Sequence, residues 1–211
     1  MTSLTQHDIL AWLLALQEVY SENKTYLTEL DSAIGDADHG INMDRGFTAV
    51  KTELEKASFP DIGAVFKTVA MTLIKTVGGA SGPLFGTLFL RASTACSGKT
   101  ELQASDLVEL FDLGVEGIIQ RGKAQLEDKT MLDTLIPVVQ AMQQALQSGT
   151  DLSTLLREAA TTAETGMKST IPLQARKGRA SYLGERSIGH QDPGATSAYL
   201  LLNTACDVWC N

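Results

Sequence analysis

Apolar residues recur every three to four positions along almost the whole chain, which is the period of an amphipathic helix. From Thr5 to about Leu30, for example, Ile9, Trp12 and Leu16 fall on one helical face. No stretch alternates with a period of two between turn residues, so strands are not expected. The pattern predicts an all-α protein.

Capping residues, proline and glycine divide this pattern into about eight helices. Asp61 is the expected N-cap of the third helix, and either Ser105 or Asp106 that of the fifth. The helices are expected near residues 5–30, 41–56, 61–77, 83–97, 105–120, 130–147, 151–169 and 193–209. With no linker or internal repeat, they predict one all-α domain over residues 1–211, in which about eight antiparallel helices follow one another in up-and-down order.

Four of the loops between these helices are unusually rich in Gly, Asp, Ser or Arg. They are the first, third and seventh loops and, more weakly, the fifth. Alternate loops of an up-and-down array emerge at the same end. We therefore expect these four loops to form one site at one end of the helices.

The first loop, residues 31–40, contains three carboxylates and neither lysine nor arginine. Asp31, Asp36 and Asp38 repel one another unless a cation lies between them, and oxygen ligands favour a hard ion such as Mg²⁺ or Ca²⁺ over zinc. The spacing does not match an EF-hand. A solvated acidic turn fits this loop about equally well. His39 either contacts a ligand or orients an aspartate.

The third loop, residues 77–87, has glycines that let backbone N–H groups approach an anion closely. The helix that follows, expected from Pro83, adds the positive end of its dipole, and Ser81 or Thr87 could supply a hydroxyl. The loop lacks the Gly-Lys-Ser/Thr of a Walker A motif, so metal ions would have to neutralise a bound phosphate. Because small residues also permit close helix packing, phosphate binding is favoured only slightly by this loop alone.

The seventh loop, residues 172–192, concentrates four basic residues in an otherwise acidic chain. A loop this long without predicted structure is usually functional or disordered. It could cover the site and bring an arginine to a phosphate, or dock an anionic partner; a solvated basic surface is the alternative. In the fifth loop, Gly122 permits close approach and Met131 could lie against a flat ring, although a core position is more usual for methionine.

Composition narrows the function classes. The 211 residues are 44% hydrophobic and 20% charged, as in a globular protein, and the net charge of −8 argues against sequence-independent nucleic-acid binding. Cys96, Cys206 and Cys210 form no CxxC pair and are expected to be free thiols in a reducing cytosol. No segment reaches the length of a membrane span, so we expect a soluble, cytoplasmic protein.

Three of the loops together resemble one family. The motifs Gly35-Asp36-Ala37-Asp38-His39-Gly40 and Gly78-Gly79-Ala80-Ser81-Gly82, with the run from Lys177 to Ala195, are similar to those of the nucleotide-binding (L) subunits of dihydroxyacetone kinase. The resemblance extends over essentially the whole chain and is greatest to the bacterial subunits that work with the phosphotransferase system. Ala37 stands where many relatives have glycine, a change that removes no ligand.

The resemblance implies a barrel of eight antiparallel helices that holds ADP and two Mg²⁺ ions at one end. It implies that Asp31, Asp36 and Asp38 are the metal ligands. It implies that the nucleotide is bound by His39, Gly40, Ile41, Asn42, Ala80, Ser81, Gly122, Met131, Arg179, Asp192, Pro193 and Gly194. No residue is expected to act as nucleophile, acid or base, because metal ions and positioning dominate phosphoryl transfer.

The resemblance also implies a phosphoryl relay in which ADP stays bound as a coenzyme. A phosphoprotein of the phosphotransferase system would phosphorylate the ADP, and the γ-phosphoryl group would pass to dihydroxyacetone on a separate K subunit. The alternatives are an ATP-exchanging kinase subunit, a nucleotide-dependent regulator of a transcription factor, and a helical interaction module with an adventitious acidic turn. Neither nucleic acid nor a membrane is expected as a partner, and a homodimer is left open.

Overall fold

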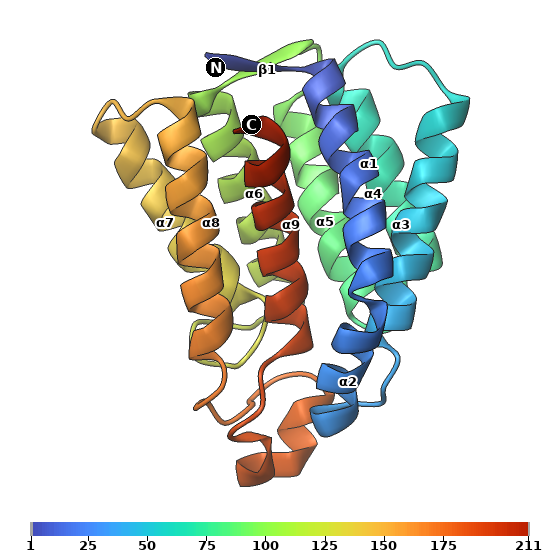
Figure 1. The fold of residues 1–211 in the computed structure, drawn as a ribbon, viewed down its shortest axis with the longest axis vertical. Helices are drawn as coiled ribbons and strands as arrows, with labels where there is room; N and C mark the ends of the chain where they lie inside the picture. Colours follow the sequence, from blue (N-terminus) through green and yellow to red (C-terminus); the bar gives the residue numbers. More distant parts are fainter. Residues whose placement is uncertain (1, 211) are drawn as a thin grey trace.

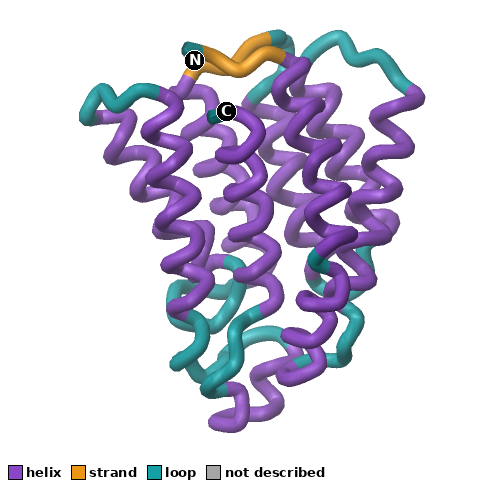
Figure 2. The backbone as a smooth tube through the Cα atoms, in the orientation of Figure 1, coloured by secondary structure: helices purple, strands orange, loops and turns teal. Residues whose placement is uncertain are grey.

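The computed structural model describes residues 2–210, which form nine α-helices, one 3₁₀ helix and two short strands (Figures 1 and 2). The predicted all-α class is confirmed. The elements are β1 (Ser3–Thr5), α1 (Gln6–Glu22), α2 (Lys24–Ile34), α3 (His39–Lys56), α4 (Ile62–Thr76), α5 (Ser81–Ala95), β2 (Glu101–Gln103), α6 (Ala104–Gly122), α7 (Leu132–Gln147), α8 (Leu152–Ser169), the 3₁₀ helix η1 (Arg179–Ser187) and α9 (Pro193–Trp209).

The α-helices form a closed ring. From α3 onward each helix packs against the next in the sequence, and α9 returns against α1, which in turn packs against α3. α2 continues the direction of α1 and contacts the same two neighbours, so the two together make one of eight positions in the ring (Figure 1). The expected up-and-down barrel of about eight antiparallel helices is confirmed. Across residues 2–210, no helix has both the length and the apolar character that crossing a bilayer requires.

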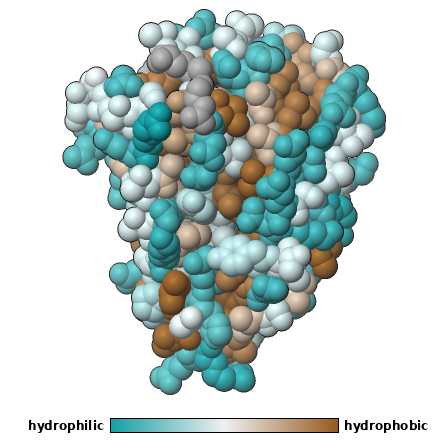
Figure 3. Space-filling view, viewed as in Figure 1, coloured by the Kyte–Doolittle hydropathy of each residue, from teal (hydrophilic) through white to brown (hydrophobic). Residues whose placement is uncertain are grey.

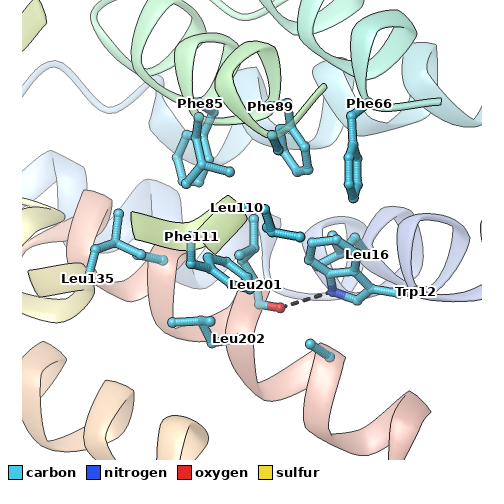
Figure 4. Packing of buried hydrophobic residues seen from close by; sticks show 14 of the residues in the cluster. Trp12, Leu16, Phe66, Phe85, Phe89, Leu110, Phe111, Leu135, Leu201 and Leu202 are labelled. Carbon is cyan, nitrogen blue, oxygen red and sulfur yellow. Dashed lines mark hydrogen bonds between the residues drawn. The ribbon is translucent and has the colours of Figure 1, made fainter. Parts of the chain in front are cut away.

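The middle of the ring is filled by large side chains (Figure 4). The Trp12 ring of α1 lies 6.1 Å from that of Phe89 on α5 and 5.0 Å from that of Trp209 on α9, measured between centroids. The indole Nε1 of Trp12 donates a hydrogen bond of 3.1 Å to the carbonyl of Leu201, so its polar group is paired although the side chain is buried. This cluster joins the first and last helices and closes the ring.

The prediction of one continuous helix over residues 5–30 was wrong. Asn23 ends α1 and begins α2, with φ −90° and ψ 5°. Its side-chain amide donates to the carbonyl of Val19 at 2.8 Å, a local hydrogen bond that competes with helix continuation. The apolar period continues across the break, which is why the pattern did not reveal it.

The expectation of no strands was also wrong in detail. Residues 3–5 (β1) pair antiparallel with residues 101–103 (β2), with Leu4 opposite Leu102. Both strands are three residues long, too short to display an alternating pattern. The ribbon lies at the end of the barrel opposite to the chemistry-bearing loops and ties the start of α1 to the start of α6 (Figure 2).

The helix caps match the sequence where an aspartate precedes the helix directly. Asp61 accepts a hydrogen bond of 2.7 Å from the Ala64 N–H at the start of α4, as expected. At α6, however, the N-cap is Gln103 rather than Ser105 or Asp106. Asp106 is the third helical residue and its carboxylate accepts from the Gln103 N–H at 2.8 Å, so it completes a capping box instead.

The four chemistry-bearing loops emerge together at the lower end of the barrel in Figure 1. The seventh loop was expected to lack regular structure, which was wrong, because Arg179–Ser187 forms the 3₁₀ helix η1. On the face seen in Figure 3, hydrophilic residues separate smaller groups of hydrophobic ones. On this face, the lower end is therefore distinguished from the rest of the barrel by its loops and not by a continuous apolar surface.

The packing of α5 gives a stability prediction. Phe89 is 1% exposed inside the barrel, whereas its neighbour Leu90 is 40% exposed on the outer face. Phe89→Ala is expected to lower the free energy of unfolding in urea by about 3–5 kcal/mol, because it leaves a cavity. The control Leu90→Ala should change it by about 0.5 kcal/mol or less. Equal losses in the two variants would contradict the assignment of the barrel interior.

Candidate functional site

A cavity of about 590 Å³ lies where the four loops meet. Its wall is built from the end of α2 and the start of α3, the loop and first turn of α5, the α6–α7 connection, and the segment from Lys177 to Gly194. This volume is in the range of pockets that enclose a small organic ligand. The up-and-down order therefore brings together segments as far apart in the sequence as Asp31 and Gly194, as the alternation of the loops predicted.

The cavity wall includes most of the residues that the resemblance assigned. Those that line it are Asp31, Asp36, Asp38, His39, Asn42, Ala80, Ser81, Gly122, Met131, Arg179, Asp192, Pro193 and Gly194. Two others, Gly40 and Ile41, are not among the lining residues. Ile41 is 44% exposed, and a Cβ on Gly40 would lie 2.0 Å from the carbonyl oxygen of Lys24. Gly40 thus permits α3 to pack closely on α2, and contact of these two residues with a ligand stays a prediction.

The three aspartates of the first loop form one cluster. One carboxylate oxygen from each of Asp31, Asp36 and Asp38 lies within 4.8 Å of the other two. Oxygens on opposite sides of one Mg²⁺ ion are about 4 Å apart, so the cluster has the size and the donor type that this ion requires. Asp31 is buried, and the other two aspartates line the cavity. The residues present therefore fit a hard divalent cation.

Backbone hydrogen bonds hold Asp31 in this cluster. Its Oδ2 accepts from the N–H of Asp38 at 2.9 Å and of His39 at 3.1 Å, so a residue of α2 caps the start of α3. A Cβ on Gly35 would lie 2.0 Å from the Asp31 Oδ1, which explains the glycine. Ala37 has φ 60°, a left-handed conformation that costs a residue other than glycine about 1–2 kcal/mol. Alanine in place of glycine at this position takes no ligand oxygen away, but its left-handed conformation strains the turn.

An arginine reaches the cluster from the other side of the cavity. The Arg179 guanidinium, at the start of η1, lies 2.9 Å from the Asp36 carboxylate. The Arg179 side chain is largely exposed, so the pair adds little to stability. Its consequence is positional, because it connects the seventh segment to the first loop and places a positive charge at the acidic cluster.

The third loop presents a helix N-terminus to the cavity. α5 begins at Ser81, and no side chain caps it, so its first N–H groups are available to an anion. Gly79 has φ 65°, and a Cβ on Gly82 would lie 2.2 Å from the Val77 carbonyl oxygen, so both glycines are needed for this turn. Ser81 lines the cavity, whereas the Thr87 hydroxyl donates to the Pro83 carbonyl at 2.7 Å. Of the two hydroxyls considered, Ser81 is the one at the site.

His39 connects two serines. Its Nδ1 lies 3.2 Å from the Ser81 hydroxyl and its Nε2 lies 2.7 Å from the Ser197 hydroxyl of α9. Burial lowers the pKa of His39, although Asp31 and Asp38 act in the opposite direction. The imidazole therefore orients Ser81 through its side chain, and only its backbone N–H bonds to Asp31. Ser197 was not identified from the sequence, where it is an ordinary small residue of a helix.

One wall of the cavity is apolar and was also missed. It is formed by Leu84, Ile118, Ala124 and Leu132, next to the expected Met131. In the sequence these residues are indistinguishable from core positions, and Met131 indeed also packs in the core cluster. Such a wall suits the flat face of a ring, while the acidic cluster and the α5 N-terminus lie in the polar part of the cavity.

Asp192 closes the cavity at the start of α9. Its carboxylate accepts from the Ala195 N–H at 2.7 Å as the N-cap, and its own N–H donates to the Thr170 hydroxyl at 3.0 Å. Burial raises the pKa of Asp192 to about 7, even though Lys129 lowers it. Burial in turn lowers the pKa of Lys129, a lysine that was not singled out from the sequence.

Comparison with known proteins identifies the relatives of the chain. The DAK2 domain family matches residues 33–207. The chain is 48% identical to the PEP-dependent dihydroxyacetone kinase, ADP-binding subunit DhaL, of Escherichia coli (strain K12), over 95% of both chains. It is 47% identical to the ADP-binding subunit DhaL of PEP-dependent dihydroxyacetone kinase 1 of Listeria innocua, over 92% of both chains. These kinases are phosphotransferases.

A solved structure shares the fold. The chain superposes on the dihydroxyacetone kinase from C. freundii, solved in complex with AMP-PNP and Mg²⁺, with a TM-score of 0.73 and 19% identity. The match covers 98% of this chain and 35% of that longer one, so the chain spans about a third of its length. The resemblance seen in the loop motifs is confirmed: the chain belongs to the DAK2 family, which includes the ADP-binding subunits of PEP-dependent dihydroxyacetone kinases.

Proposed function

We propose that the chain is the ADP-binding subunit of a PEP-dependent dihydroxyacetone kinase. In this proposal, bound ADP is phosphorylated by a phosphoprotein of the phosphotransferase system, and the γ-phosphoryl group passes to dihydroxyacetone on a separate K subunit. The main support is that an oxygen-only cluster and an uncapped helix N-terminus share one cavity of suitable size. The names of relatives about half identical over nearly their whole length support the substrate and the subunit role.

The proposed roles of the residues follow from their positions. Asp31, Asp36 and Asp38 would hold Mg²⁺, of which we propose two ions, and when bound these ions neutralise the charge of the transferred phosphoryl group. The Ser81 hydroxyl and the first N–H groups of α5 would bind phosphate oxygens. Arg179 would add a positive charge from the opposite side. The apolar wall beside Met131 would contact the base.

No residue of the chain needs to act as a nucleophile or base in this scheme. Phosphoryl transfer through a loose transition state depends on alignment and charge neutralisation. Both ring nitrogens of His39 are engaged with serine hydroxyls, which fixes Ser81 rather than freeing the imidazole for proton transfer. The phosphodonor and the sugar would both be presented to the open cavity by other chains, and we propose that the complex is cytoplasmic.

The alternatives use the same cavity. An ATP-exchanging kinase subunit would release ADP after each turnover, and a nucleotide-dependent regulator would display the seventh segment to a transcription factor. The regulator alternative gains some support from Tyr182 of η1, because this side chain is 88% exposed and therefore accessible to a partner. A helical interaction module would not bind a nucleotide at all.

The released ligand separates these functions. The purified protein is dialysed extensively and denatured, and the supernatant is examined for nucleotide and Mg²⁺. About one ADP per chain supports the coenzyme role. An empty protein that binds ATP reversibly supports the exchanging kinase. Failure to bind any nucleotide in the presence of Mg²⁺ overturns the proposal and leaves the interaction module.

The acidic cluster gives a direct prediction. Asp36→Asn and Asp38→Asn each remove one metal-ligand charge, so Mg²⁺-dependent retention of ADP is expected to fall by about tenfold or more, while the circular dichroism spectrum stays helical. Retention is measured by calorimetry with ADP and Mg²⁺. Glu29→Gln is the matched control, because it removes an exposed carboxylate from the same helix that bears Asp31. Undiminished retention in both aspartate variants would refute the metal assignment.

Asp192 gives a prediction on pH dependence in the nucleotide-free protein. Its pKa of about 7 lies above the ordinary value of 3.8, so between these pH values the folded state keeps a proton that the unfolded state has lost. Stability therefore falls as pH rises through this window, by up to about 1.4 kcal/mol per pH unit. Asp192→Asn keeps the capping oxygen and removes this loss.

The comparison uses urea unfolding of both proteins from pH 4 to pH 8 with a chelator present. The free energy of unfolding of Asp192→Asn, minus that of the wild type, is expected to rise up to about pH 7 and then level off. Other carboxylates cancel in the difference. A difference that is constant over the whole range would show that Asp192 ionises normally.

A further inference from the structure

Lys129 lies in the α6–α7 connection with only 1% of its surface exposed. Its ammonium donates hydrogen bonds to backbone carbonyls, at 2.7 Å to Thr170, 3.1 Å to Leu173 and 3.5 Å to Ile171, and also to His190. These four carbonyls form a carbonyl cage around the charge. An ammonium has three N–H donors, so the three shorter contacts use all of them.

The carbonyl cage joins the two ends of one segment. Thr170, Ile171 and Leu173 stand at the start of the stretch from 170 to 192, and His190 stands near its end. The Gly189 N–H also donates to the Ile171 carbonyl at 2.8 Å, so the ends meet in a narrow neck. Carbonyl oxygens that converge on one point repel each other, and a positive charge at that point removes the repulsion.

The same segment contributes to the candidate site. Lys177, Gly178 and Arg179 line the cavity, and Asp192 caps α9 directly after the neck. The Arg176 N–H donates to the Asp128 carbonyl at 3.0 Å, so the loop that contains Lys129 also holds the segment further along. The position of Arg179 beside Asp36 therefore depends on where the neck is held.

The backbone around Lys129 is strained. Lys129 has φ 62° and Glu127 has φ 67°, left-handed conformations that favour glycine. Such strain persists only where the surrounding contacts over-determine the conformation, and it occurs often at functional sites. The buried ammonium is one of the contacts that fix this loop, together with the Asp133 carboxylate, which accepts from the N–H groups of Glu127 and Thr130.

We propose that Lys129 is a positioning residue whose ammonium serves as an internal cation, holding the 170–192 segment over the cavity so that Arg179 faces the acidic cluster. Lys129 is among the residues that line the cavity, but the three donors of its ammonium are used by the carbonyl cage, so it acts through the cage and the backbone. The part of the inference that concerns nucleotide rests on the proposed function. The part that concerns the neck does not, and the two are tested separately.

The first test is amide hydrogen exchange of the nucleotide-free protein. Lys129→Met keeps the length and the backbone strain of the lysine but removes the charge and three donors. Exchange in residues 170–192 is expected to be faster by about tenfold or more, because charged hydrogen bonds are lost there, while the centre of α1 exchanges as in the wild type. Lys123→Met is the matched control, since Lys123 lies in the same connection, also has positive φ (52°), and is exposed.

Rescue by a small cation tests the charge itself. In Lys129→Ala, ammonium chloride is expected to restore much of the protection of residues 170–192, whereas tetramethylammonium chloride at equal ionic strength is not, because it has no N–H donor.

ADP is expected to dissociate about tenfold faster from Lys129→Met than from Lys123→Met, in line with the loss of hydrogen bonds at the neck.

Two results would overturn the inference: exchange in residues 170–192 that equals the wild type, or exchange that rises equally in every helix. Should Lys129→Met not fold, Lys129→Gln, which removes the charge but keeps a polar side chain, allows the same comparison, and the same two results overturn the inference. If the wild type binds no ADP, the proposed function fails while the exchange data still decide the role of Lys129.

Discussion

The mutual repulsion of Asp31, Asp36 and Asp38 is the constraint on which this end of the protein depends. Three carboxylates within 4.8 Å are stable together only where positive charge or N–H donors face them. The protein supplies part of that compensation: two N–H groups of α3 bond to Asp31, and the Arg179 guanidinium pairs with Asp36. Asp38 has two other carboxylates within 4.8 Å, and a divalent cation bound as proposed would compensate their charge.

The barrel makes this arrangement possible because the β1–β2 ribbon lies at one end and the functional loops lie at the other. The interior around Trp12 joins the first and last helices, and the β1–β2 ribbon ties the opposite end, so most of the framework lies away from the functional loops. Those loops therefore tolerate costs that a core would not, such as the left-handed Ala37 and Lys129 and the buried carboxyl of Asp192.

The sequence predicted what depends on local pattern and on topology. The helical period predicted the antiparallel helices, the loop motifs through their family resemblance predicted the barrel, and the alternation of the loops predicted one shared site. What it missed depends on partners distant in the chain: Ser197 matters because its hydroxyl meets a histidine 158 residues away, and Lys129 because carbonyls more than 40 residues away converge on it. The break at Asn23 escaped because a helix can change course without interrupting its apolar period.

The two cations of the site hold the seventh segment with different strength. Arg179 is exposed, and such an ion pair contributes only about 0–1 kcal/mol, so the middle of the segment can separate from the first loop easily. Lys129 is buried among carbonyls, and releasing it would leave several buried polar groups unpaired, each at about 1–3 kcal/mol. The middle of the segment, and not the neck, is therefore the part that we expect to move if the cavity opens. If the chain keeps its nucleotide through repeated transfers, as proposed, this difference would let the segment move at Arg179 while the neck stays fixed.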